Sequence, residues 1–110
     1  MQTPSSKQWL TTIFMNLQFE WDNHKAALNL KKHGVSFEEA QTVFNDSLAC
    51  IFDDEWHSIG ERREIIIGHS KHQRLLLVFF TQRAEGIIRI FSSRLATQKE
   101  RRDYENGTKF

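Results

Sequence analysis

The sequence predicts a single domain of the α+β class, in which two helices near the N-terminus precede a largely antiparallel sheet. Its length of 110 residues suits one compact domain. The apolar pattern changes from helical spacing to strand-like runs after residue 47. The segments between the later strands are short enough to be hairpin connections. The predicted order is β-α-α-β-β-β-β-α, with two helices on one face of a four- or five-stranded sheet.

The first element is a short strand, followed directly by a helix with clear end signals. Residues 17–21 alternate apolar and polar side chains, which is typical of a half-buried strand. Asp22 is the expected N-cap of a helix that ends at His33, and Gly34 stands where a left-handed C-cap residue belongs. Residues 1–14 are expected to form an N-terminal extension, so the predicted domain covers residues 15–110.

A second helix start follows at once. Ser36 and Glu39 have capping-box spacing, in which the hydroxyl and the carboxylate each bind a free amide at the helix end. Several apolar residues fall on one face of this helix: Phe37, Ala40, Val43 and Phe44. The polar turn at residues 45–47 is expected to end it.

The second half of the chain is strand-rich. Four apolar segments are expected to form strands: 48–52, 63–68, 75–81 and 87–93. Thr97 and Glu100 form a second capping box, which opens a polar C-terminal helix that reaches about Glu105.

Composition excludes several classes of protein. Cys50 is the only cysteine, so neither an intrachain disulfide nor a cysteine zinc cage can form, and its apolar neighbours favour a packed thiol. No apolar run approaches the roughly 20 residues of a membrane span, and the N-terminus lacks the pattern of a signal peptide. We therefore expect a cytoplasmic protein with no membrane association.

Charge is distributed unevenly along the chain. Residues 1–61 hold four Lys/Arg and nine Asp/Glu, a net charge of −5, whereas residues 62–110 hold eleven and five, a net charge of +6. A basic half suits a polyanionic ligand, and an acidic half could face a basic partner. Solvated surfaces of uneven sign are the plain alternative.

Arginines on the later strands are the most distinctive feature. They lie at positions 63, 83, 89 and 94, and Arg89 interrupts a strongly apolar strand. Because burying an unpaired charge is costly, Arg89 must leave the core or find a partner. Guanidinium groups bind phosphate oxygens in a bidentate fork, so an open sheet face could bind a phosphate backbone. Ion pairs with nearby glutamates explain the same arginines equally well; the candidates are Glu61, Glu64 and Glu85.

Cleavage of RNA without a metal needs a base for the 2′-hydroxyl, cations for the phosphorane and an acid for the 5′-oxygen. Arginine can supply the cations. The residues able to transfer the protons are His33, Glu61, Glu100 and Tyr104. Each has a structural alternative: His33 could cap a helix dipole, Glu100 could serve only its capping box, and Tyr104 could simply pack.

No metal or cofactor signature stands out. Gly-rich phosphate loops and the common hydrolase motifs are missing from the sequence. His69 with His72, or His57 beside the acidic residues 53–55, could contact a metal, but both groups are more typical of solvated loops. A metal hydrolase built on these histidines stays as an alternative, and we expect no cofactor.

Read together, these segments resemble the BrnT family of toxins from residue 15 to residue 105. The matching pieces are Phe19-Glu20-Trp21-Asp22, Lys25, Asn29, Lys32-His33-Gly34-Val35-Ser36-Phe37-Glu38-Glu39-Ala40, Gly60-Glu61-Arg62-Arg63, Gly68, Thr81-Gln82-Arg83, Arg89-Ile90-Phe91-Ser92-Ser93-Arg94-Leu95-Ala96, Glu100 and Tyr104. The segment 32–40, followed at this distance by 89–96, is the most specific part of the resemblance.

The resemblance implies a RelE-like fold and a ribonuclease that arrests translation. It also implies a BrnA-type antitoxin with a ribbon-helix-helix domain, a heterotetrameric complex, and contact with operator DNA only through the antitoxin. The implied catalytic groups are Arg63, Arg83 and Arg94, with His33, Glu100 and Tyr104 as candidates for proton transfer or support. The implied RNA-binding residues are Arg89, Trp21 and Arg101. A module that binds nucleic acid or antitoxin without catalysis is the alternative function.

Overall fold

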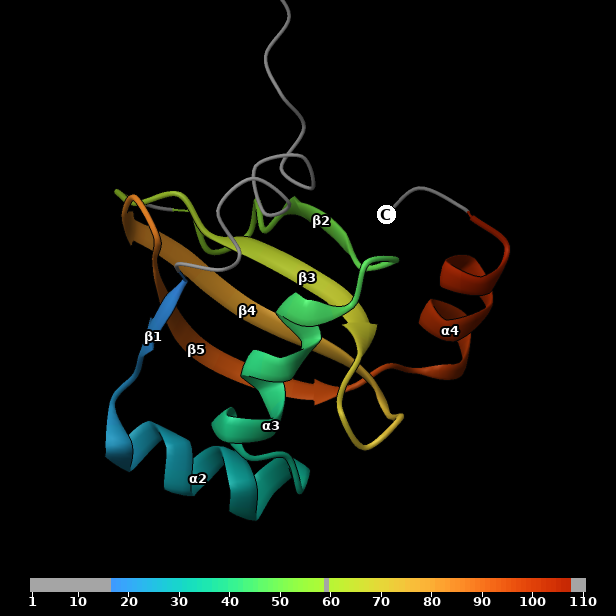
Figure 1. Ribbon diagram of the computed structural model, residues 1–110, viewed down its shortest axis with the longest axis horizontal. Coiled ribbons are helices and arrows are strands. Elements are labelled where there is room, and N and C mark those ends of the chain that lie inside the picture. The colour runs from blue at the N-terminus through green and yellow to red at the C-terminus, as the bar shows by residue number, and fades with distance from the viewer. Residues whose placement is uncertain (1–16, 59, 108–110) are drawn as a thin grey trace, which may run out of the picture.

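A five-stranded mixed sheet, in the order β1-β5-β4-β3-β2, forms the centre of this computed structural model, which describes residues 17–58 and 60–107 (Figure 1). β1 runs parallel to β5, and the other neighbours are antiparallel. The strands are β1 (Gln18–Glu20), β2 (Cys50–Asp53), β3 (Glu64–His69), β4 (Leu75–Ala84) and β5 (Ile87–Leu95). The predicted α+β class is confirmed, with five strands and one parallel pair.

The N-terminal helix α2 (Asn23–His33) begins and ends at the predicted residues. The Asp22 carboxylate accepts a hydrogen bond from the Lys25 amide at 3.0 Å, which satisfies one free donor of the first turn. Gly34 closes the helix with a φ of 68°, a backbone conformation that glycine adopts without steric cost.

The second helical segment consists of α3 (Phe37–Gln41) and the 3₁₀ turn η2 (Thr42–Asn45). Only half of the capping box predicted at its start is present. The Ser36 hydroxyl accepts from the Glu39 amide at 3.0 Å. The Glu39 carboxylate does not return to the helix end but is buried, where it accepts from the Ser70 hydroxyl and the Arg74 guanidinium. This ion pair lowers the pKa of Glu39, mainly through the Arg74 hydrogen bond.

The C-terminal helix α4 (Gln98–Glu105) has the complete capping box that the sequence predicts. The Thr97 hydroxyl accepts from the Glu100 amide at 3.1 Å, and the Glu100 carboxylate accepts from the Thr97 amide at 2.9 Å. None of the helices in the described part of the chain is long and apolar enough to cross a bilayer.

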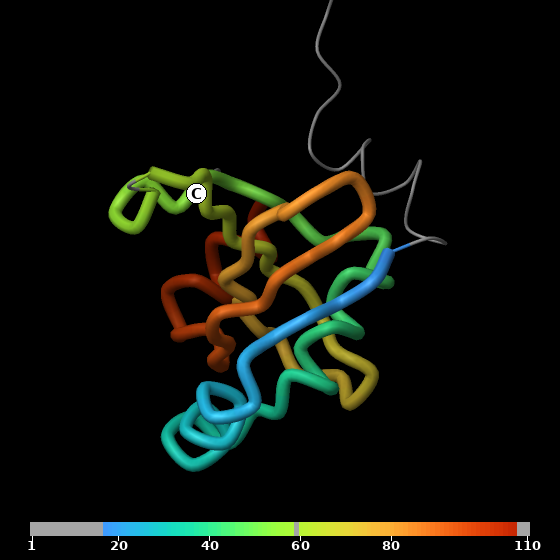
Figure 2. Tube along the Cα trace, turned by 90° about the vertical axis from the view of Figure 1, so that its left-hand side faces the viewer, coloured from blue at the N-terminus to red at the C-terminus, as the bar shows by residue number. Residues whose placement is uncertain are grey.

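Alternating side chains on β4 divide the core between the two faces of the sheet. Leu76, Val78 and Phe80 join the larger cluster, which is completed by apolar residues of α3 and η2. Leu75 and Leu77 join a smaller cluster on the opposite face, with Tyr104 of α4 packed against it. Figures 1 and 2 show α3 and α4 on opposite sides of the sheet, with α2 below β5 in Figure 1.

Cys50 is exposed, not packed, because it opens the edge strand β2. The proposed extension, residues 1–14, lies outside the described residues.

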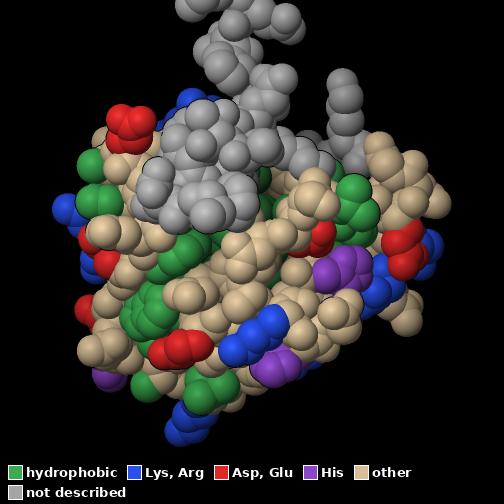
Figure 3. All heavy atoms as spheres, in the orientation of Figure 1, with side chains coloured by type: hydrophobic (Ala, Val, Ile, Leu, Met, Phe, Trp, Pro, Cys, Tyr) green, Lys and Arg blue, Asp and Glu red, His purple; other side chains and the backbone are tan. Residues whose placement is uncertain are grey.

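Charged side chains of both signs are dispersed over the α3 side of the molecule. In Figure 3, which shows this side, Lys and Arg side chains are scattered among acidic ones instead of forming one basic patch.

Candidate active site

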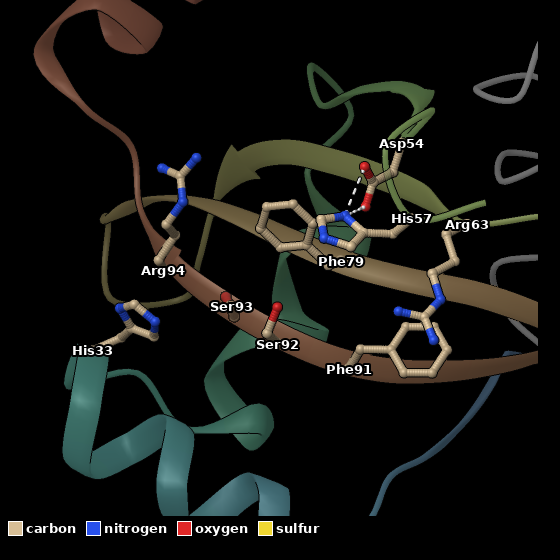
Figure 4. Close-up of a pocket in the computed structure, with 9 residues that line it drawn as sticks. All are labelled: His33, Asp54, His57, Arg63, Phe79, Phe91, Ser92, Ser93 and Arg94. Carbon is tan, nitrogen blue, oxygen red and sulfur yellow. Dashed lines mark hydrogen bonds and ion pairs between the residues drawn. The ribbon is translucent and has the colours of Figure 1, made fainter. Parts of the chain in front are cut away.

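An open pocket of about 280 Å³ lies on the face of the sheet opposite α3 (Figure 4). Its walls come from four separate parts of the chain: the end of α2, the β2–β3 loop, β4 and β5. The lining residues are His33, Asp54, His57, Arg63, Phe79, Phe91, Ser92, Ser93 and Arg94. Figure 4 shows His33 and Arg94 at one end, Arg63 beside Phe91 at the other, and the Asp54–His57 pair between them.

The shape of the pocket depends on an irregularity in the pairing of β4 with β5. Phe79 pairs with Ser92 and Phe80 with Ile90, so Phe91 is an extra residue on β5. Such a bulge bends the strand and re-aims its side chains. Phe91 and the three residues that follow it on β5 all line the pocket.

His33 reaches the pocket because α2 is fixed to β5. Asn29, the buried residue of α2, donates to the carbonyls of Val35 and Ser93, both at 2.9 Å. The Asn29 side-chain oxygen also accepts from the Ser93 amide at 3.1 Å. This pair of bonds places the C-terminal end of α2, and with it His33, against β5 beside Arg94.

Asp54 and His57 form a pair that resembles the carboxylate–imidazole unit of acid–base catalysts. The His57 Nδ1 lies 2.9 and 3.1 Å from the two carboxylate oxygens of Asp54. The Asp54 side chain is 6% exposed and that of His57 is 62% exposed, so a buried carboxylate orients an accessible ring. With Nδ1 donating to Asp54, the Nε2 atom of His57 carries a free lone pair.

The loop that bears this pair is closed by hydrogen bonds at its base. The Asp54 amide donates to the Arg63 carbonyl at 2.9 Å. The Ser58 hydroxyl donates to the Asp54 carbonyl at 2.7 Å and accepts from the Arg63 amide at 3.0 Å. Asp54 and Arg63 therefore lie at the two ends of one pinned loop, and His57 enters the pocket from within it.

Arg63 is a cation held in place mainly by an aromatic ring. Its guanidinium carbon lies 4.0 Å from the centre of the Phe91 ring. Its Nε is buried without a hydrogen bond to any described residue, and its ion pair with Glu61 is long, at 3.8 Å. The Arg63 charge is thus positioned but poorly neutralised, as a phosphate-binding group requires.

Arg94 is more strongly engaged. Its two terminal nitrogens donate to the two carboxylate oxygens of Glu100 at 2.7 and 2.9 Å, a bidentate ion pair. The Arg94 hydrogen bonds hold the pKa of Glu100 at about 2, against an ordinary 4.5, and the same pair raises the pKa of Arg94. Glu100 is therefore ionised near neutral pH and suits the anchoring of Arg94 better than proton transfer.

Comparisons with known proteins identify the family of the chain. Residues 21–100 match the model of a family described as "Ribonuclease toxin, BrnT, of type II toxin-antitoxin system". The chain belongs to the BrnT family. A crystal structure of the Brucella abortus ribonuclease toxin BrnT superposes with a TM-score of 0.58 and 23% identity, over 74% of this chain and 99% of that one. No curated protein matches the chain at a significant level. The family resemblance seen in the sequence is thus confirmed.

Two of the arginines carried over from the BrnT resemblance do not lie with the others. Arg83 and Arg89 both contact the Glu20 carboxylate, at 3.5 and 2.9 Å, on the β1 side of the sheet. Neither lines the pocket. Of the four strand arginines, Arg63 and Arg94 line the pocket. Arg101 is an exposed residue of α4.

Tyr104 and Trp21 also lie outside the pocket lining of this BrnT chain. The Tyr104 hydroxyl donates to the Leu48 carbonyl at 3.3 Å, and its ring packs against His69. Burial, the largest effect, raises the pKa of Tyr104. Trp21 packs edge-on against Phe37 in the larger core cluster. The contacts of Tyr104 match the packing alternative that the sequence left open.

Within the described residues, no three His, Cys, Asp or Glu side chains are grouped so that they could hold a metal ion. His69 instead faces Asp46 at 3.7 Å, and His57 faces Asp54. From the sequence, His57 is a candidate only for metal binding. The spacing of Asp54 and His57, which suits the two ends of a tight turn, was the available signal for an acid–base pair.

Proposed function

We propose that this BrnT family ribonuclease cleaves RNA without a metal ion, by transfer of the phosphate to the neighbouring 2′-hydroxyl in the pocket around His57. The observation that carries the proposal is the meeting of an Asp54-oriented imidazole and a weakly neutralised Arg63 in one open pocket.

His57 is the proposed general base. Its Nε2 accepts the proton of the 2′-hydroxyl while that oxygen attacks the adjacent phosphorus. Asp54 keeps the ring in the required orientation and stabilises the imidazolium that forms. The bond between phosphorus and the 5′-oxygen then breaks, which leaves a 2′,3′-cyclic phosphate on one fragment and a 5′-hydroxyl on the other.

The remaining groups support the charge and the second proton transfer. Arg63 stabilises the additional negative charge on the phosphorane oxygens, and its stacking on Phe91 fixes its orientation in advance. Arg94, anchored by Glu100, adds a second positive charge. His33, at the Arg94 end of the pocket, is the proposed acid that protonates the departing 5′-oxygen.

The biological role follows from the family. A type II system implies an antitoxin partner. We propose a ribbon-helix-helix antitoxin of the BrnA type, a heterotetramer that contacts operator DNA only through the antitoxin, and translational arrest in the cytoplasm when the toxin is free. Expression without antitoxin should stop incorporation of labelled amino acids into protein.

The test uses the purified chain, an end-labelled single-stranded RNA and EDTA. We expect new ends that carry 2′,3′-cyclic phosphates, and no cleavage of the same oligonucleotide with 2′-O-methyl groups. Activity lost in EDTA and restored by a divalent ion would contradict metal independence. Retention of RNA with no new ends would favour the non-catalytic binding module.

A further inference from the structure

The turn that carries the Asp54–His57 pair also presents an aromatic side chain to solvent. Trp56 is 89% exposed, the most exposed of the large apolar residues in the described part of the chain. Tryptophan is seldom left so open, because its large ring surface favours burial or a binding partner.

The position of Trp56 is defined by the turn itself. The His57 amide donates to the Asp54 carbonyl at 3.3 Å, and the His57 ring bonds the Asp54 carboxylate. Both ends of the four-residue turn are therefore pinned, with Trp56 as the residue directly before the proposed general base. The flanking Asp53 is neutralised by Arg62 at 2.9 Å.

We infer that Trp56 stacks on an RNA base next to the scissile phosphate and so selects unpaired RNA. This inference rests on the proposed function and names its substrate class. RNA-binding proteins read single strands by stacking splayed bases on aromatic side chains, and stacking tolerates any base because each has a π-face. The pocket binds the phosphate and sugar, while Trp56, the chain neighbour of the lining residue His57, holds a flanking base outside it. A base paired within a duplex cannot present its face to the ring.

The test is a binding measurement that does not depend on cleavage. The full chain is titrated into an unstructured 2′-O-methyl RNA 20-mer with a fluorescent label, and into the same strand annealed to its complement. Variants Trp56→Leu and Trp56→Phe are compared, because leucine keeps an apolar side chain but loses the aromatic face. Leu48→Ala, a variant at an exposed apolar residue outside the pocket, is the control.

We expect the wild type to favour the single strand, and Trp56→Leu to weaken that binding about fivefold or more. Trp56→Phe should recover most of the affinity, and Leu48→Ala should bind as the wild type does. Equal binding by Trp56→Leu and wild type would overturn the inference, even where the wild type cleaves RNA normally. Loss of antitoxin binding with unchanged RNA affinity would also overturn it and assign Trp56 to a protein interface. If the wild type cleaves no RNA, the same titration still decides the role of Trp56.

Discussion

Asn29 and Ser93, 64 positions apart, bind each other through two hydrogen bonds that join α2 to β5. The asparagine side chain satisfies the amide and the carbonyl of Ser93 in the way that a neighbouring strand would. Because Arg94 directly follows Ser93 and His33 lies about one helical turn beyond Asn29, this link sets one end of the pocket.

Replacing Asn29 should therefore cost stability. In Asn29→Ala the Ser93 amide and carbonyl lose their side-chain partner in a buried setting, and we expect the free energy of unfolding to fall by about 1–3 kcal/mol. Urea denaturation followed by circular dichroism measures the change. Lys32→Ala, an exposed change on the same helix, should leave the midpoint unmoved; equal losses in both variants would mean that the link contributes nothing specific.

Arg63 and Arg83 should differ sharply in their effect on cleavage. Arg63→Ala removes the stacked cation from the pocket, and we expect kcat/KM for RNA to fall about 100-fold or more. Arg83→Ala breaks only a long contact with Glu20 outside the pocket and should cleave normally. Equal activity of the two variants would exclude Arg63 from the site.

Asp54→Asn tests the orientation of the imidazole. The amide keeps the shape of the side chain, but it does not stabilise the imidazolium and can present an N–H group to Nδ1. We expect a loss in kcat of about 100-fold, with KM little changed. Steady-state kinetics on the end-labelled RNA separate the two constants. A change confined to KM would assign Asp54 to substrate binding instead.

The Arg94–Glu100 pair should make the fold sensitive to acid. Because the folded state lowers the pKa of Glu100 from 4.5 to about 2, its stabilisation is complete above pH 4.5 and is lost as the pH falls towards 2. Glu100→Gln should be less stable than wild type by roughly 1–2 kcal/mol at neutral pH, with the difference shrinking across this window. Asp103→Asn, at an exposed i,i+4 pair with Lys99, is the matched control and should cost at most about 0.5 kcal/mol. A constant difference between Glu100→Gln and wild type at every pH would contradict the assignment.

Local signals predicted most of the fold. Asp22, Gly34 and Thr97 mark helix ends through contacts within a few residues, and such contacts can be read from spacing. Glu39 shows the limit of that reading. Its capping-box spacing is correct, but its carboxylate pairs with Arg74, 35 positions away, which only the folded chain brings near.

The candidate site was less predictable for the same reason. The bulge at Phe91 reverses the alternation of side chains along the rest of β5, and no residue type in the sequence predicts a bulge there. The arginine positions in the sequence also group Arg83 and Arg89 with the pocket arginines, but the distant residue Glu20 binds these two outside the pocket. Three candidates from the sequence line the pocket: Arg63, Arg94 and His33. The sequence indicates no catalytic role for His57.

The most direct test of the account is the single-turnover rate of RNA cleavage in EDTA by wild type and by His57→Ala. Circular dichroism establishes that both are folded, and His69→Ala serves as the histidine control outside the pocket. We predict that His57→Ala loses activity about 100-fold or more while His69→Ala keeps it. Undiminished cleavage by His57→Ala would contradict the assignment of the general base and, with it, the proposed mechanism.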